Sequence, residues 1–245
     1  MNWLRKLRIA ICPSRKKRKQ LRTALQNEQY KKNNTIDIPS DVAKYVRLTI
    51  NGKNNKVRIG NIRFGEAKTL NIVINGSDNE ITIENGVYIR TLEITIGEPG
   101  DSPKAHDTSV HIGERSTFAQ TRLFTSHSHT RIEIGRDCMF ASGIYIQHTD
   151  SHPIYELGQE AHFNYADELK IGNHVWVGMG VNILKNVKIA DDCILGAYSV
   201  IAKSFSEEHC AIAGNPARVI RRGITWKPQH TEKFIENIRP MRDTP

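Results

Sequence analysis

The chain has 245 residues, 38% of them hydrophobic, and a formal net charge of +9. No stretch approaches the roughly 18 consecutive apolar residues of a membrane-spanning helix, which excludes a transmembrane protein. Collagen and general disorder are excluded too, because Ile, Val and Leu recur along almost the whole length.

The positive charge is concentrated in the first 32 residues. They hold eleven Lys and Arg against one acid, Glu28, a net of +10, and the remaining residues sum to −1. The near-zero net charge of the residues after 32 argues against nucleic acid as a partner. Helical spacing of Trp3, Leu4 and Leu7, with a break at Pro13, predicts a basic helical segment and linker over residues 1–44. Residues 1–32 suit peripheral contact with an anionic membrane surface or an anionic polymer; a solvated helix packed on neighbouring subunits is the alternative.

The cysteines argue against an oxidised or metal-bound framework. The four residues Cys12, Cys138, Cys193 and Cys210 lie far apart, and no two of them form a C-x-x-C pair. Neither a disulfide framework nor a Cys-rich zinc site is expected, and a reducing cytoplasm fits best. With the basic N-terminus, this predicts a cytoplasmic protein that could be peripheral to the inner face of a bacterial membrane.

The dominant pattern has a period of six. Aliphatic residues recur at every sixth position in one uninterrupted series: Ile171, Val177, Ile183, Ile189, Leu195 and Ile201. This period fits neither a helix nor a simple strand, but it fits short strands joined by corners, three sides to a coil of about 18 residues. We therefore predict an all-β solenoid, a parallel β-helix with hexapeptide repeats, over residues 45–206. An ordinary sandwich of alternating strands is the alternative.

The register continues upstream and is broken in two places. Further inward positions are expected at Ile112, Phe118 and Phe124, at Ile134, Phe140 and Ile146, and in the similar segments 50–59 and 74–83. Ile146 and Ile171 are 25 residues apart where one step needs six, so a loop must leave the solenoid at about residues 147–168. A smaller excursion spans residues 98–108. Loops on a rigid scaffold often carry function.

The long loop carries two histidines and a carboxylate. It reads His148-Thr-Asp150-Ser-His152-Pro-Ile-Tyr155. Histidine titrates near neutral pH and is the usual general base, and Asp150 or a backbone carbonyl could hold its tautomer. From the spacing alone, an inert surface histidine is the simpler interpretation.

Two more motifs follow in order. Residues 171–178 read Ile-Gly-Asn-His-Val-Trp-Val-Gly, and residues 213–218 read Ala-Gly-Asn-Pro-Ala-Arg. Together with the six-residue register and the loop His-Pro-Ile, they resemble the left-handed parallel β-helix acyltransferases of the hexapeptide-repeat family. The similarity is to galactoside, maltose and bacterial capsular-polysaccharide O-acetyltransferases, and it covers residues 110–225 closely and 45–110 loosely.

The resemblance implies an O-acetyltransferase with acetyl-CoA as co-substrate, no metal, a saccharide acceptor and a homotrimer with active sites between subunits. It makes His152 the general base and the Gly178–Met179 turn the place for an oxyanion donor. Acceptor-site or supporting residues would be His148, Asp150, Tyr155 and Trp176. Cofactor-binding residues would be Trp176, Gly178, Met179, Ala197, Ala202, Lys203, Arg218 and Arg221. Residues 207–245 are expected to form a C-terminal extension with short helical structure.

Some features depart from the family pattern and leave alternatives open. Tyr198 is bulkier than the family's residue in the cofactor groove, and Thr121 stands near an acceptor-binding Asn of the sugar acetyltransferases. An N-acetyltransferase for an amino-sugar nucleotide remains open. So does a zinc enzyme of the γ-carbonic-anhydrase type, for which His111, His148 and His152 are the nearest ligands, and so does a non-enzymatic scaffold. The simpler interpretation of Trp176 is a packing residue. For Lys203, Arg218 and Arg221 it is a solvated surface charge.

Overall fold

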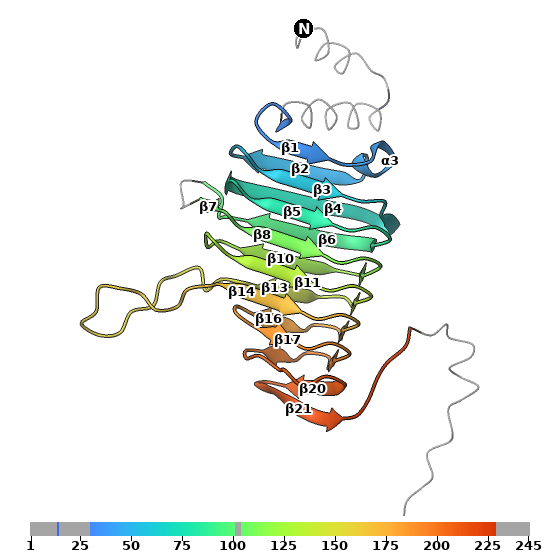
Figure 1. Cartoon of the computed structure of the whole chain (residues 1–245), viewed down its shortest axis with the longest axis vertical. Helices are drawn as coiled ribbons and strands as arrows, with labels where there is room; N and C mark the ends of the chain where they lie inside the picture. The colour runs from blue at the N-terminus through green and yellow to red at the C-terminus, as the bar shows by residue number, and fades with distance from the viewer. Residues whose placement is uncertain (1–13, 15–29, 101–103, 229–245) are drawn as a thin grey trace, which may run out of the picture.

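The computed structural model describes residue 14 and residues 30–100 and 104–228. Short parallel strands stack along one axis as the coils of a β-helix (Figure 1). Most of the predicted basic helical segment lies outside the described residues, as does the chain from 229 to 245. The first strand, β1 (Thr35–Asp37), already pairs with β3 (Lys56–Ile59), so the coils start about ten residues before the expected boundary at 45.

One wall of the solenoid is a seven-stranded parallel sheet. Its strands run in chain order: β1, β3, β5 (Glu80–Ile83), β8 (Ser109–Ile112), β11 (Arg131–Ile134), β14 (Glu168–Ile171) and β17 (Lys188–Ile189). Each strand pairs with the strand one coil earlier and one coil later. The backbone N–H and C=O groups of every inner strand are thereby satisfied between coils.

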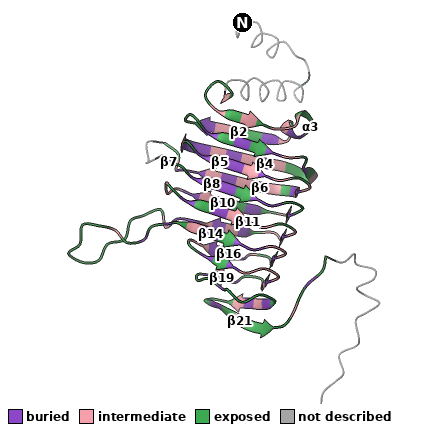
Figure 2. Cartoon of the chain, in the orientation of Figure 1, coloured by how far each residue is buried: buried purple, intermediate pink, exposed green. Residues whose placement is uncertain are grey.

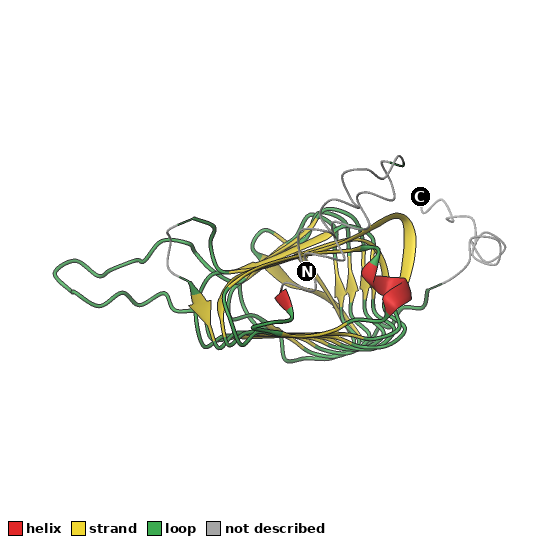
Figure 3. Cartoon of the chain, turned by 90° about the horizontal axis from the view of Figure 1, so that it is seen from above, coloured by secondary structure: helices red, strands yellow, loops and turns green. Residues whose placement is uncertain are grey.

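The other two walls belong to a 14-stranded sheet that folds around the remaining sides, as the view along the axis shows (Figure 3). In the first coils it is built from long strands, β2 (Val46–Asn51), β4 (Arg63–Ser77) and β6 (Tyr88–Ile96). Later coils split it into two columns. One is β9 (Thr117–Phe118), β12 (Met139–Phe140), β15 (Trp176–Val177) and β18 (Ile194–Leu195); the other is β10 (Thr121–Thr125), β13 (Ile144–Gln147), β16 (Asn182–Leu184) and β19 (Val200–Ile201). Outside these columns lie β7 (Ala105–His106) and the short helix α3 (Ser40–Ala43).

The predicted inward positions of the last coils are confirmed. All six aliphatics from Ile171 to Ile201 are at most 3% exposed, and buried and exposed residues alternate along the strands (Figure 2). Partners in the last coils are 18 residues apart, as for Asn173 and Asp191, whereas partners in the first coils are 24 apart, as for Asn55 and Asn79. The regular spacing thus belongs to the last coils, and the long strands make the earlier coils larger.

The expected inward position of Phe124 is wrong. Leu123 pairs with Ile146 and is 2% exposed, while Phe124 is only half-buried. The reason is a corner one residue shorter between Phe118 and the next inward side chain. Phe118 itself is fully buried and stacks on Phe140 with ring centroids 4.6 Å apart.

The expected helical extension after residue 206 is also wrong for the residues described. Residues 210–222 form an antiparallel hairpin of β20 (Cys210–Gly214) and β21 (Ala217–Arg222). The strand β20 still pairs with β18 in parallel, so the hairpin adds the last rung and then reverses. A solenoid end needs such a cover because it otherwise presents unpaired backbone groups.

Buried asparagines connect the first coils at one corner. The Asn79 amide donates to Asn55 Oδ1 and to the Ala105 carbonyl, both at 3.0 Å, and Asn55 donates in the same way to Asn34. The Asn79 Oδ1 accepts the Thr108 N–H at 3.1 Å. These side chains satisfy backbone groups that the wide corners leave unpaired.

We expect Asn79→Leu to lower the free energy of unfolding by roughly 3 kcal/mol, because the buried Ala105 carbonyl and Thr108 N–H lose their partner and Asn55 Oδ1 loses one of its two donors. The exposed Asn61 is the matched control, since its side chain has no such role, and Asn61→Leu should change stability by at most about 0.5 kcal/mol. Urea denaturation of the two variants measures the difference. Equal stability of both would contradict the role of the asparagine column.

Candidate functional site

Residues 148–167 leave the solenoid between β13 and β14 and project as a long loop (Figure 1). Asn164 ties the two sides of this loop together near its base. Its amide donates to Asp150 Oδ2 at 2.8 Å and to the His152 carbonyl at 2.9 Å, and its Oδ1 accepts the Ile154 N–H at 2.8 Å. Sequence reasoning missed Asn164, because nothing in its local sequence marks it as the link.

His148 anchors the loop and is fully buried. Its Nε2 lies 3.3 Å from the Asp167 carbonyl, and its Nδ1 accepts the Asn186 N–H at 3.5 Å. Burial is the main cause that lowers the pKa of His148 to about 4, so the ring is neutral near neutral pH. His148 therefore supports the loop from inside the coil and does not face solvent.

Asp150 is held as a carboxylate by Asn164 and Lys185. Burial alone would raise its pKa, but hydrogen bonds from Asn164 and from Lys185, 3.1 Å away, outweigh it and leave the pKa below its usual value. The carboxylate is thus engaged by Lys185 and Asn164 rather than by a histidine. It fixes the start of the loop to β16 and its neighbours.

His152 is exposed on the loop, and its imidazole makes no hydrogen bond with the described residues. Its backbone, by contrast, is held on both sides. The His152 N–H donates to the Asp150 carbonyl at 2.7 Å, and its carbonyl accepts from Asn164. The side chain is therefore available to a ligand from a fixed backbone position.

A groove of about 570 Å³ lies at the base of the loop beside His152. Ser151 and Pro153 line it, together with five aromatic and imidazole side chains: His127, His129, Tyr155, His162 and Tyr165. Tyr155, predicted as an acceptor-site residue, is part of this lining. A lining of aromatic and imidazole rings with hydroxyl and N–H groups at their edges suits a sugar ring.

His127 is the inner wall of this groove. Its Nδ1 accepts the Ala166 N–H at 2.9 Å, which leaves the proton of the neutral ring on Nε2. Burial, and then the neighbouring His162, lower its pKa. His127 can therefore act as a neutral N–H donor, and its signal in the sequence was weak because Ala166 lies 39 residues away.

Two exposed apolar regions lie apart on the chain. The loop carries Ile154, Tyr155, Leu157, Phe163 and Tyr165, and the coil edge carries Trp176, Met179 and Tyr198. Each side chain is more than a third exposed, and Leu157 is fully exposed. Exposed aromatic and aliphatic clusters of this kind are typical of interaction surfaces.

The predicted cofactor residues of the repeats lie in the last coils. Trp176, Gly178 and Met179 lie at and just after β15, Ala197 follows β18 one coil later, and Ala202 follows β19 in the other column. A Cβ on Gly178 would meet the Ala197 N and the Leu195 carbonyl at 2.7 Å, so this glycine is required by the close stacking of coils. The Gly178 N–H donates to the Leu195 carbonyl, whereas the Met179 N–H has no partner among the described residues.

The three basic residues predicted for the cofactor are exposed. Arg218 and Arg221 lie on β21, and Lys203 Nζ lies 5.5 Å from the Phe205 ring centroid. None of the three has an acidic partner among the described residues, in contrast to Arg222, which pairs with Glu207 at 2.9 Å. Exposed cations without an acidic partner suit an anionic ligand.

The three described thiols are buried and poor nucleophiles. Burial raises the pKa of Cys138 to about 12 and that of Cys193 to about 11, and it raises the pKa of Cys210 as well.

In the part of the chain that the structure describes, no three His, Cys, Asp or Glu side chains gather as metal ligands, so His111, His148 and His152 are not brought together. None of the helices described has the length and apolar character that a membrane crossing requires.

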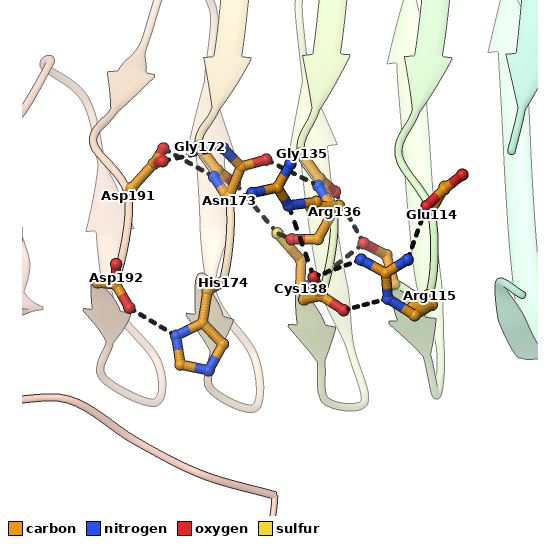
Figure 4. Close-up of polar contacts among 12 residues, drawn as sticks. Glu114, Arg115, Gly135, Arg136, Cys138, Gly172, Asn173, His174, Asp191 and Asp192 are labelled. Atoms are coloured by element: carbon orange, nitrogen blue, oxygen red, sulfur yellow. Dashed lines mark hydrogen bonds and ion pairs between the residues drawn. The ribbon is translucent and has the colours of Figure 1, made fainter.

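Charged side chains also stack along one corner of the coils (Figure 4). Arg115 binds Asp137 through two hydrogen bonds of 2.7 and 2.9 Å, which lower the pKa of that carboxyl. One coil after Asp137, His174 Nδ1 lies 2.7 Å from Asp192 Oδ1. This corner leads directly into β15 and Trp176.

The buried neutral His148 predicts a loss of stability in acid. An unfolded histidine titrates near pH 6.5 and the folded one near 4, so the unfolded state takes up more protons in this window. The free energy of unfolding should therefore fall by roughly 3 kcal/mol between pH 6.5 and pH 4 through this residue. His148→Gln, which does not titrate, should flatten that slope in urea denaturation series, and the exposed His106→Gln should not. An unchanged slope in His148→Gln would contradict the assignment.

Comparisons with known proteins point to the same family as the sequence motifs. The family described as bacterial transferase hexapeptide (six repeats) matches residues 169–203. A polysialic acid O-acetyltransferase of Neisseria meningitidis is 35% identical over 202 residues, which cover 79% of this chain and 86% of that protein. A polysialic acid O-acetyltransferase of Escherichia coli O1:K1 is 30% identical over 139 residues, 56% of this chain, and the match spans only 44% of that relative's length.

One solved structure agrees with the fold over most of its length. The polySia-specific acetyltransferase NeuO superposes with a TM-score of 0.66 at 26% identity, over 84% of this chain and 90% of that one. The match to the Neisseria meningitidis protein extends over most of both chains. The chain therefore belongs to the hexapeptide-repeat family of acyltransferases.

Proposed function

We propose that this protein is an acetyl-CoA-dependent O-acetyltransferase that acts on a hydroxyl of a bacterial capsular polysaccharide, on a left-handed β-helix. The observation that carries the proposal is the exposed His152 on a backbone-anchored loop, in a chain whose relatives over most of its length are named polysialic acid O-acetyltransferases. A sialic-acid polymer is accordingly the first acceptor to test.

His152 acts as the general base. It takes the proton of the acceptor hydroxyl while that oxygen attacks the thioester carbonyl of acetyl-CoA. The tetrahedral intermediate then collapses, the carbon–sulfur bond breaks, and the CoA thiolate leaves and is protonated. The Met179 N–H, which has no other partner among the described residues, is placed to donate to the oxyanion. The buried thiols support direct transfer without a cysteine intermediate.

The two ligands occupy different surfaces. The acceptor sugar lies in the groove lined by His127, Tyr155 and Tyr165 beside His152. Acetyl-CoA lies along the coil edge from Trp176 and Met179 past Ala197 and Ala202, with its phosphates near Lys203, Arg218 and Arg221. Charge-assisted hydrogen bonds to the phosphates hold the nucleotide end.

The site is completed by a second copy of the chain. The apolar loop and the apolar coil edge are different surfaces, so contact of one with the other is heterologous, and a rotation of 120° between copies closes it into a ring of three. A homotrimer of this kind brings His152 of one subunit to Trp176 of the next. We further propose that the basic residues 1–32 keep the enzyme in the cytoplasm near an anionic membrane surface or the anionic polymer.

Substitution of the general base should remove most of the activity. We expect His152→Ala to lower the rate of acetyl transfer to the polysaccharide by roughly 10² to 10⁴-fold, because no other group replaces the proton acceptor. Release of CoA from acetyl-CoA, measured with polysialic acid, other capsular oligosaccharides and amino-sugar nucleotides, checks this. His106→Ala, an exposed histidine outside the groove, is the control.

A wild-type rate of acetyl transfer in His152→Ala would contradict the role of His152 as general base. CoA release with amino-sugar nucleotides alone would favour the N-acetyltransferase instead.

Loss of a single phosphate-binding cation should weaken donor binding selectively. We expect Arg218→Ala to raise the KM for acetyl-CoA by roughly tenfold, since a charge-assisted hydrogen bond contributes about 1.5–3 kcal/mol, while kcat changes little. Arg222→Ala is the matched control on the same strand, because Arg222 is paired with Glu207. Steady-state kinetics at varied acetyl-CoA separate the two, and an equal KM in both variants would contradict the assignment.

A further inference from the structure

The chain turns back on itself after the C-terminal hairpin. Residues 223–228 follow β21, and the Ile224 N–H donates to the His209 carbonyl at 3.0 Å, at the last coil. Two residues further on, Trp226 reaches the coil that carries His174 and Trp176. It is 7% exposed, although it belongs to no strand.

Trp226 is fixed to the corner by two separate contacts with His174. Its indole N–H donates to the His174 carbonyl at 2.8 Å. Its ring stacks on the imidazole with centroids 4.3 Å apart and planes 9° from parallel. The imidazole in turn is held by Asp192 at 2.7 Å, in the arrangement that Figure 4 shows for His174 and Asp192. The orientation of Trp226 is therefore set from the solenoid itself.

Trp226 also contacts Trp176. The two ring centroids are 6.1 Å apart and the planes are inclined by 46°, within the range of favourable aromatic pairs. Trp176 lies two residues after His174, at the start of β15, and is 37% exposed. Because the Trp176 indole is this exposed, few neighbouring side chains restrict its rotamer. The contact with the buried Trp226 ring therefore limits its orientation.

We propose that Trp226 is a positioning residue for the acetyl-transfer reaction, which holds the Trp176 ring in its working orientation through the stack Asp192–His174–Trp226. The proposal rests on the proposed function, in which Trp176 lies at the reacting groups. Trp226 itself touches neither ligand. Its effect on the rate comes from the geometry of Trp176, because small displacements at a reaction site are costly.

A kinetic comparison tests this in the full-length protein. We expect Trp226→Ala to lower kcat about tenfold with the KM for acetyl-CoA changed by less than about twofold, since orientation matters more in the transition state than in the bound ground state. Trp226→Phe, which keeps a ring on His174, should recover most of the rate. Thr225→Ala, an exposed neighbour in the same segment, should match wild type.

The double variant separates positioning from a general structural role. If Trp226 acts through Trp176, then Trp176→Leu combined with Trp226→Ala has the kcat of Trp176→Leu alone, within about twofold. If the two losses multiply instead, the proposal is overturned.

Quenching of Trp176 fluorescence tests the same contact without any activity. The chain has three tryptophans, so Trp3→Phe with Trp226→Phe leaves Trp176 as the sole reporter. We expect the acrylamide quenching constant to rise about twofold when position 226 carries Ala instead of Phe, because a released exposed side chain changes rotamer freely. Adding Thr225→Ala to the Phe background should not change it.

The two readouts distinguish the possible failures. An unchanged quenching constant shows that Trp226 does not hold Trp176 and overturns the inference. Increased quenching in a protein that transfers no acetyl group to any acceptor supports the contact but removes the proposed function, and with it the catalytic part of the inference. Increased quenching with the expected fall in kcat supports both.

Discussion

The coil-to-coil ladder of parallel backbone hydrogen bonds constrains everything else in this protein. Each aliphatic from Ile171 to Ile201 can be buried only if its strand lies directly over the strand of the previous coil. Extra residues therefore have no place inside the stack and must leave it outward. The loop of residues 148–167 is such an excursion, and its two ends are pinned where β13 and β14 rejoin the ladder.

Stacking also explains how distant residues form one site. Side chains 18 residues apart become neighbours on adjacent coils, as His174 and Asp192 do. Lys185 reaches Asp150 from the coil after β16, and Asn164 reaches it from the returning side of the loop. The exposed His152 can remain unpaired because its backbone, rather than its ring, carries the loop contacts. An exposed imidazole is thus kept accessible on a segment that is fixed at both ends.

The C-terminal hairpin has two consequences for the same edge. It ends the parallel ladder with an antiparallel turn, which covers the last coil, and it presents Arg218 and Arg221 beside the coil edge. The chain then runs back so that Trp226 packs on the corner before β15. The exposed cations of β21 and the contact with Trp176 therefore both come from residues that follow the repeats, not from the repeats themselves.

The sequence by itself determined the solenoid, because a six-residue period of buried aliphatics is a local property that no other fold repeats. It also located the loop and named His152 through its motif. It misplaced Phe124 and the structure of residues 210–222, since corner length and strand reversal depend on what lies one coil away. The roles of His127, Asn164 and Trp226 were decided only by the tertiary structure, because their partners lie 39, 14 and 52 residues away in sequence. Contacts across coils leave no local pattern, so only the stacked chain brings these residues together.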